Sequence, residues 1–184
     1  DTKRLMATCD MYSRLLFAAP STPEEWCGFL EEYRHSDVSL ISFEDTGLAE
    51  VQTSTGGVDD FAFYDESRRL LHEGMMKKDQ SLLFPKLLDY GHEMGLRLFL
   101  SMRMGLSDIA LPYDEMHFEI PFVREHPGLR CKDRDGSFID SLSYLYPEVQ
   151  DFMTERLLSL LSFDCDGISL IFTRGIPYVL FEEP

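Results

Sequence analysis

The sequence has few basic residues, no long apolar run and no paired-cysteine motif, and each absence excludes a class of protein. Seventeen Lys and Arg residues stand against thirty-three Asp and Glu residues, which gives a net charge of -16. A surface of that sign repels phosphate backbones and anionic lipid headgroups, so we expect neither nucleic acid nor a membrane as a partner. The longest apolar runs have the length of strands, far short of the roughly 20 residues that a bilayer span requires.

Metal and cofactor sites are also not expected. The four cysteines are scattered and show no CxxC or Cys/His spacing that would make a zinc site. They are predicted to be mainly buried free thiols, although the sequence alone leaves a disulfide open. No two of the three histidines that fall in predicted loops share a ligand spacing; these are His72, His117 and His126.

The sequence does contain a repeated pattern in which a helix is followed by a strand. Three times an amphipathic helix ends in a short polar turn and continues into a β-rich apolar segment. The helices are predicted to follow Thr22-Pro23, to span about 82–94 and to begin at Pro147, and Trp26 lies on the apolar stripe of the first. Four strands are predicted, at residues 4–9, 38–43, 96–102 and 168–172. This pattern predicts an α/β fold, a partial (β/α)8 TIM-type barrel of about four parallel strands.

The connections between these elements are unequal. Each helix reaches its strand through about four residues, whereas the segments after the second and third strands, residues 44–80 and 103–146, run to about forty each. Loops of that length build or cover a site, and in barrels they leave the carboxyl end of the sheet. Since a complete barrel needs about 250 residues, we expect residues 1–184 to be its N-terminal half, with the remainder C-terminal to Pro184.

Polar side chains follow the predicted strands at this same end. Asp10 and Glu44 end neighbouring strands and could form the carboxylate pair of a glycosidase, one on each side of the bond. The alternative is that they cap helices or neutralise arginines. Substrate-binding candidates are the nearby polar and aromatic residues Asp45, Arg103, Arg174, Tyr113 and Tyr144. His35, His92 and Asp166 should lie at the opposite end, where they would serve stability.

The order of several motifs resembles a bacterial glycosyl-hydrolase-like family related to family 10 glycosidases. The motifs are residues 92–105, His126-Pro127-Gly128-Leu129, Tyr146-Pro147-Glu148-Val149 and residues 166–174. The resemblance covers nearly the whole chain and implies the N-terminal half of a TIM-type glycosidase barrel. Two positions depart from the pattern: Ile171 stands where the family has an aspartate in the fourth strand, and Ser143 replaces the aspartate before the third helix. Glu182 or Glu183 could take over the missing carboxylate.

The sequence therefore supports two main hypotheses. The first is a glycoside hydrolase-like protein that acts on O-glycosidic bonds of an oligosaccharide or polysaccharide. The second, favoured by Ile171, is a non-catalytic carbohydrate-binding module on the same scaffold. An isomerase or aldolase on a similar barrel is the weaker third hypothesis, because no lysine ends a strand to form a Schiff base.

Overall fold

The computed structural model describes residues 5–11, 14, 22–44, 83–105, 121–172 and 177–182. The chain divides into two compact units. The first comprises Asp1–Thr46, Tyr64–Met102 and Leu160–Ser169, and the second comprises Gly47–Phe63, Arg103–Ser159 and Leu170–Pro184.

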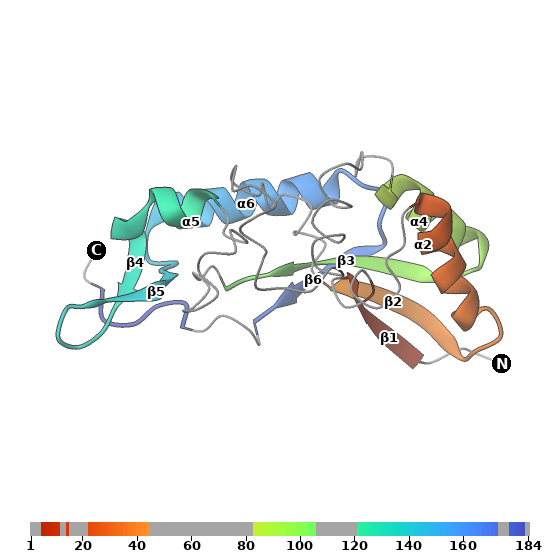
Figure 1. Cartoon of the computed structure of the whole chain (residues 1–184), viewed down its shortest axis with the longest axis horizontal. Helices are drawn as coiled ribbons and strands as arrows, with labels where there is room; N and C mark the ends of the chain where they lie inside the picture. Colours follow the sequence, from red (N-terminus) through yellow and green to blue (C-terminus); the bar gives the residue numbers. More distant parts are fainter. Residues whose placement is uncertain are drawn as a thin grey trace, which may run out of the picture. The chain divides into compact units, whose positions relative to one another are not determined.

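The main sheet has the predicted parallel topology (Figure 1). Its order is β1-β2-β3-β6, with β1 paired parallel to β2 and β2 paired parallel to β3. β6 runs in the direction of β3, because Asp166 N donates to Leu98 O and Met104 N donates to Ile171 O, each at 2.9 Å. The strands are β1 Leu5–Asp10, β2 Val38–Glu44, β3 Arg97–Arg103 and β6 Gly167–Ile171. The predicted arrangement of strands as parallel neighbours in chain order is thus confirmed.

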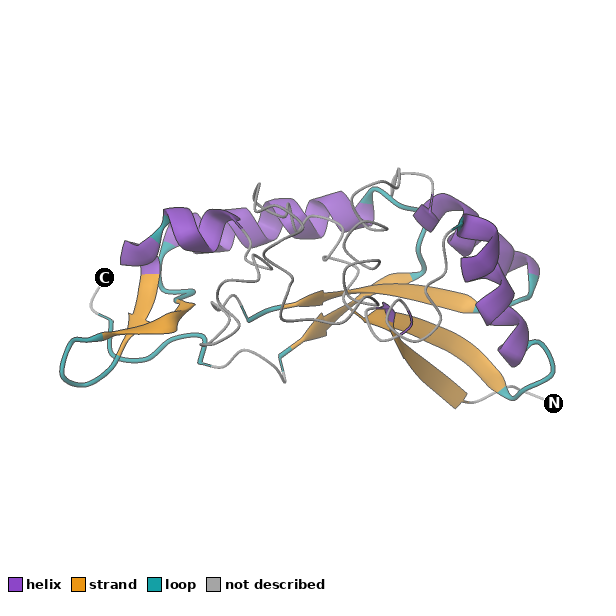
Figure 2. Cartoon of the chain, in the orientation of Figure 1, coloured by secondary structure: helices purple, strands orange, loops and turns teal. Residues whose placement is uncertain are grey.

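Two helices of the first unit, α2 Pro23–Leu30 and α4 Leu83–Glu93, lie together on one side of the sheet (Figure 2). The side chain of Thr22 caps α2 by accepting a hydrogen bond from Glu25 N at 3.2 Å, and Pro23 fills the first turn, where no N–H is needed. α4 approaches β3 closely at Gly91, where a Cβ atom would lie 2.3 Å from Leu98 Cδ1. Only glycine fits this helix-to-strand contact without a shift of Leu98.

The core of the first unit forms between these helices and the strands. Trp26 is 2% exposed, as predicted for its place on the helical stripe, and Leu30, about one helical turn later, is fully buried. The other large, fully buried side chains of this unit come from α4, β2 and β3, namely Leu87, Leu88, Ile41, Phe43, Leu98, Leu100 and Met102.

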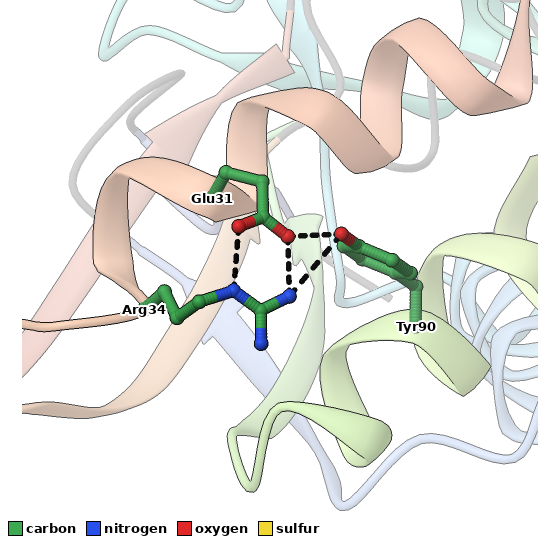
Figure 3. Close-up of polar contacts among 3 residues, drawn as sticks. All are labelled: Glu31, Arg34 and Tyr90. Carbon is green, nitrogen blue, oxygen red and sulfur yellow. Dashed lines mark hydrogen bonds and ion pairs between the residues drawn. The ribbon is translucent and has the colours of Figure 1, made fainter.

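A polar cluster joins the end of α2 to α4 at the surface (Figure 3). Nε and Nη2 on one edge of the Arg34 guanidinium donate to the two oxygens of the Glu31 carboxylate, which also accepts a hydrogen bond from the Tyr90 hydroxyl. Arg34 comes directly after the short helix η1 Glu31–Tyr33. Arg34 first, and then Tyr90, lower the pKa of Glu31 to about 2. Because the groups are exposed, this cluster orients the two helices more than it stabilises the fold.

The second unit contains helices and strands within residues 103–146, a segment that was predicted from the sequence to be a long loop. Its elements are α5 Pro121–Glu125, the short helix η6 Pro127–Leu129, β4 Arg130–Lys132, β5 Phe138–Leu142 and most of α6 Pro147–Leu161. β4 and β5 pair antiparallel as a separate two-stranded sheet. The prediction that 103–146 is mainly loop is therefore wrong for its second half, whereas α6 starts at Pro147 as predicted.

The four cysteines are all free, and Cys9 and Cys131 are buried. Within the described part of the chain, no helix is both long enough and apolar enough to cross a membrane.

Replacing Trp26 by Ala should lower the free energy of unfolding by about 3–5 kcal/mol, because it leaves a large cavity in the core. Gly28→Ala in the same helix is the matched control. Nothing lies within 4 Å of a Cβ atom there, and alanine favours the helix, so stability should rise by up to about 1 kcal/mol. Urea unfolding measures both; equal stability of the Trp26 variant and the parent protein would contradict the assigned core.

Candidate functional site at the carboxyl end of the sheet

Asp10 and Glu44 lie opposite each other at the carboxyl ends of neighbouring strands. They are register partners in the parallel β1/β2 pair and are the last residues of their strands. Neighbouring strands are about 4.8 Å apart, so two side chains at one register position project next to each other. The structure thus brings together the two residues predicted as a carboxylate pair, and both belong to the first unit.

The alternation of side chains places this pair on the face of the sheet away from the helices, which is polar over the last positions of β1 and β2 and is called the polar face below. Successive residues of a strand point to opposite faces, so Cys9 and Phe43 share one face while Asp10 and Glu44 share the other. Cys9 and Phe43 are 4% and 0% exposed, respectively, as expected for the helix-covered face. Thr8 and Ser42, the register pair two residues earlier, continue the polar face.

Ser101 on β3 extends this polar face toward the third strand. Its hydroxyl is fully buried and donates to Phe43 O at 2.6 Å. This bond ties the backbone of β3 to that of β2 immediately before Glu44. The carboxylate pair therefore follows a part of the sheet that backbone pairing and a side-chain bond hold together.

Arg14 is a cation near this strand end, and it was not among the site residues predicted from the sequence. Its guanidinium pairs with Glu32 at 3.1 Å and lies 4.0 Å from the centroid of the Phe29 ring. Burial raises the pKa of the neighbouring Cys9 thiol to about 11, although Arg14 opposes that effect. Arg14 is thus positioned by α2 and η1. Its spacing four residues after Asp10 was the signal that could have identified it.

The remaining candidates divide into described and undescribed residues. Arg103 is the last residue of β3 and belongs to the second unit. Asp45, Tyr113 and Arg174 lie outside the described residues. Tyr144 donates its hydroxyl to Met104 O at 2.6 Å, and its ring contacts Tyr178 edge-on at 5.9 Å between centroids. Burial raises the pKa of Tyr144. Its hydroxyl therefore holds the backbone that follows β3.

Two of the residues expected at the opposite end of the sheet do meet there. Asp166 Oδ2 lies 2.9 Å from His92 Nε2 and accepts a hydrogen bond from Leu98 N at 2.7 Å. Burial alone would raise the pKa of Asp166, but the bonds from Leu98 N and His92 lower it overall. This contact holds the start of β6 beside the start of β3. His35 is exposed in the turn before β2.

Glu182, one possible substitute for the carboxylate missing at Ile171, has a structural role instead. It is 8% exposed, and its Oε2 accepts a hydrogen bond from Leu180 N at 2.7 Å. Burial raises its pKa, but hydrogen bonds from Cys131, Leu180 and Ser143 lower it overall. Burial, and then the bond to Glu182, raise the pKa of the Cys131 thiol to about 12. Such a carboxylate anchors the chain and is poorly placed to exchange protons with a substrate.

No three His, Cys, Asp or Glu side chains among the described residues are arranged to hold a metal ion. At this end of the sheet, the described residues of the first unit offer carboxylates, hydroxyls and the Arg14 guanidinium. Those groups suit acid-base chemistry and hydrogen bonding to a polyhydroxyl ligand.

Comparison with known proteins defines the fold class. No protein-family model and no curated protein matches the chain. Among solved structures, the chain is similar to the noncanonical maltogenic α-amylase AmyB from Thermotoga neapolitana. The TM-score is 0.51, with 17% identity over 96% of this chain and 40% of that chain.

Kfla1895, as an aspartate-to-alanine mutant in complex with isomaltose, gives a TM-score of 0.48 with 14% identity over 95% of this chain and 25% of that chain. The same mutant in complex with cyclobis-(1→6)-α-nigerosyl gives 0.48 with 15% identity over the same shares. The chain thus spans 40% or less of the length of these structures.

The likeness to AmyB shows the fold: this chain has the α/β arrangement of part of a (β/α) TIM-type barrel. A specific relationship to family 10 glycosidases, which the motif order suggests, stays a hypothesis.

Replacing Asp166 by Ala removes the acceptor for Leu98 N and His92. The side chain is 33% exposed, so screening reduces the loss to about 1 kcal/mol at neutral pH. Because the folded-state pKa of Asp166 is lowered, its contribution is full above the ordinary carboxyl pKa near 4 and is lost as pH falls through the lower value.

Asp164→Ala, an exposed carboxylate two residues earlier, is the control. Urea unfolding between about pH 7 and pH 3 should show the Asp166 difference shrinking with acid while the Asp164 variant follows the parent protein. A pH-independent difference for Asp166→Ala would contradict the assigned role of its charge.

Proposed function

We propose that the protein is a carbohydrate-active barrel of the glycoside hydrolase-like type, which acts on O-glycosidic bonds of an oligosaccharide or polysaccharide. In this proposal residues 1–184 are the N-terminal half of the barrel. The observation that carries it is the register pairing of Asp10 with Glu44 at the carboxyl end of a parallel sheet. In (β/α) barrels this is the end where chemistry takes place.

Two carboxyl groups are what glycoside hydrolysis requires. One protonates the leaving oxygen, and the other attacks the sugar or activates water. A separation of about 5–5.5 Å favours retention of configuration, whereas about 6.5–9.5 Å leaves room for water and gives inversion. Because Asp10 and Glu44 are on adjacent strands at one register position, the shorter separation is the more accessible, and we expect retention.

The substrate-binding roles follow from the chemistry of the other candidates. Arg103 and Arg174 would grip sugar hydroxyl or acid groups, since a guanidinium offers fixed, bidentate donors. Asp45 would accept hydrogen bonds from hydroxyl groups, and Tyr113 would stack on a sugar ring. Tyr144 can offer only its ring face, because its hydroxyl is used by Met104 O.

The edges of the main sheet support the proposal of a missing second half. β1 and β6 are the outer strands of the four-stranded order, and on β1 the side chains of Leu5 and Met6 are 58% and 64% exposed. Open edges with apolar side chains are a liability that barrel closure removes. The proposed partner is the rest of the barrel, C-terminal to Pro184.

A non-catalytic carbohydrate-binding module is the second candidate. It is favoured by Ile171, which ends β6 where the resemblance predicts an aspartate, and by Glu182, which is buried and cannot substitute for it. Under this candidate function the protein binds a carbohydrate but does not hydrolyse it.

Screening the protein against aryl glycosides and oligosaccharides separates the two candidates. If it is a hydrolase, Asp10→Asn and Glu44→Gln should each lower the rate by about 10²–10⁴-fold, the usual contribution of a positioned acid or base. Asp37→Asn, an exposed carboxylate just before β2, should leave the rate unchanged. Binding without turnover would favour the module, and full activity of both site variants would exclude this pair as catalytic.

Arg103→Ala should weaken saccharide binding by about tenfold or more with little change in stability, because it removes a bidentate donor at a half-buried surface position. Arg97→Ala, at the other end of the same strand, is the matched control. Isothermal titration calorimetry with the tightest oligosaccharide measures both. Equal losses for the two variants would contradict a site at the carboxyl end.

A further inference from the structure

The β4–β5 hairpin of the second unit presents aromatic rings for which the proposed strand-end site has no use. Gly136, with φ of 83°, and the hydrogen bond from its N to Asp133 O close the turn. Asp133 N donates to Ser137 O at 2.8 Å, and Lys132 is the register partner of Phe138. Phe138 is thus fixed directly across from Lys132.

Residues 177–182 add a third segment to this hairpin. In an antiparallel pair, the N–H and C=O groups of alternate residues point away from the partner strand. Lys132 is such a residue, and its carbonyl accepts a hydrogen bond from Phe181 N at 3.2 Å. Phe138 and Phe181 therefore flank β4, with backbones about 10 Å apart, two interstrand spacings.

The segment that carries Phe181 is firmly anchored. Ser141 Oγ donates to Pro177 O at 2.8 Å, and Tyr144 N donates to Tyr178 O at 2.8 Å. The buried Glu182 carboxylate holds the end of the segment through Leu180 N. The backbone that carries Phe181 is therefore held in place within the second unit.

Both rings are half exposed, and each has a cation on it. Phe138 is 52% exposed with Lys132 Nζ 5.4 Å from its ring centroid, and Phe181 is 49% exposed with the Arg134 guanidinium carbon 5.2 Å away. Each cation places N–H donors beside a flat apolar surface.

The charge of the hairpin narrows the class of ligand. Three basic residues, Arg130, Lys132 and Arg134, are balanced by three acidic residues, Asp133, Asp135 and Asp140. Arg130 pairs with Asp140 at 3.2 Å, and Asp135 accepts hydrogen bonds from Ser137 N and Oγ. A neutral surface on a protein of net charge -16 does not attract a polyanion.

The surface that the two rings offer is small, although Val179 and Leu180 next to Phe181 are also 48% and 38% exposed. A specific interface buries about 800 Å² on each side, much more than two half-exposed rings supply. The ligand that fits flat apolar rings edged by hydrogen-bond donors is a neutral sugar, whose pyranose face is apolar and whose rim carries hydroxyl groups. Because their backbones lie about 10 Å apart, the two rings would contact two different units of one glycan chain.

We propose that Phe138 and Phe181, with Lys132 and Arg134, form a binding surface for neutral glycan chains that is separate from the Asp10 and Glu44 site. The proposal rests on the proposed function in that both take a saccharide. The two sites use different residues in different units, so each can fail without the other.

The test is binding of maltohexaose, cellohexaose and xylohexaose to the protein by isothermal titration calorimetry, with polygalacturonate as the anionic comparison. The measurements use the Asp10→Asn/Glu44→Gln protein, so that no substrate is consumed. At least one neutral hexasaccharide should bind. Phe138→Ala and Phe181→Ala should each weaken that binding about tenfold, the effect of losing one aromatic contact.

Three controls make the result decisive. Leu158→Ala removes a side chain that is 60% exposed on α6 and should leave binding unchanged. Phe138→Tyr keeps a flat ring and should retain binding, whereas Phe138→Leu keeps only bulk and should lose it. Circular dichroism and thermal unfolding verify that each variant is folded. In the protein that keeps Asp10 and Glu44, Phe138→Ala and Phe181→Ala should leave the hydrolysis of small aryl glycosides at the parent rate.

Unchanged binding in the Phe138→Ala/Phe181→Ala double variant would overturn the proposal, as would preference for polygalacturonate or binding to none of the neutral hexasaccharides. Loss of aryl glycoside hydrolysis in the Asp10 and Glu44 variants bears only on the proposed function. Conversely, glycan binding that depends on the two Phe residues would stand even if the protein hydrolyses nothing.

Discussion

The parallel register of β2 with its two neighbours is the constraint on which the candidate site depends. Ile41 and Phe43 are fully buried on one face of β2, and Leu98 and Leu100 are fully buried at the paired positions of β3. A slip of one residue would exchange the two faces and place Ser42 and Glu44 against the helices. The apolar face therefore fixes the position of the carboxylates without touching them, and the close contact of Gly91 with Leu98 adds to that constraint.

Strong local signals explain what could be predicted from the sequence. β2 spans Val38–Glu44 against a prediction of 38–43, because four of its residues are apolar with β-branched or bulky side chains and a short polar turn precedes it. α4 ends just before Gly95, which has φ of 77°, a conformation that glycine adopts without strain. Pro147 marks the start of α6. The register of Asp10 with Glu44 followed from strand direction alone, as an expectation of the fold.

What could not be predicted depends on contacts between distant residues. β4 has three residues and β5 has five, too few for a period of two to stand out, and only the Asp135-Gly136 turn pointed to a hairpin. Glu182 looks like an exposed terminal carboxylate in the sequence. Its burial depends on Cys131, which is about fifty positions away and carries no local signal.

These cases separate two uses of carboxylates in one acidic chain. Asp166 and Glu182 each accept a backbone N–H, and in both the hydrogen bonds lower the pKa against the effect of burial. A group held in this way is ionised and fixed, which suits an anchor. Asp10 and Glu44 instead end their strands side by side on the polar face of the sheet.

The same separation applies to the aromatic residues. Trp26 is buried in the core, and the hydroxyls of Tyr144 and Tyr178 donate hydrogen bonds to backbone carbonyls. Phe138 and Phe181 have no polar group to satisfy, yet the hairpin and the buried Glu182 keep them half exposed. Exposed apolar rings on an anchored backbone cost solvation free energy in the unbound protein, which binding recovers. Given the negative charge of the whole chain and the neutral hairpin, a neutral saccharide recovers that free energy without electrostatic repulsion.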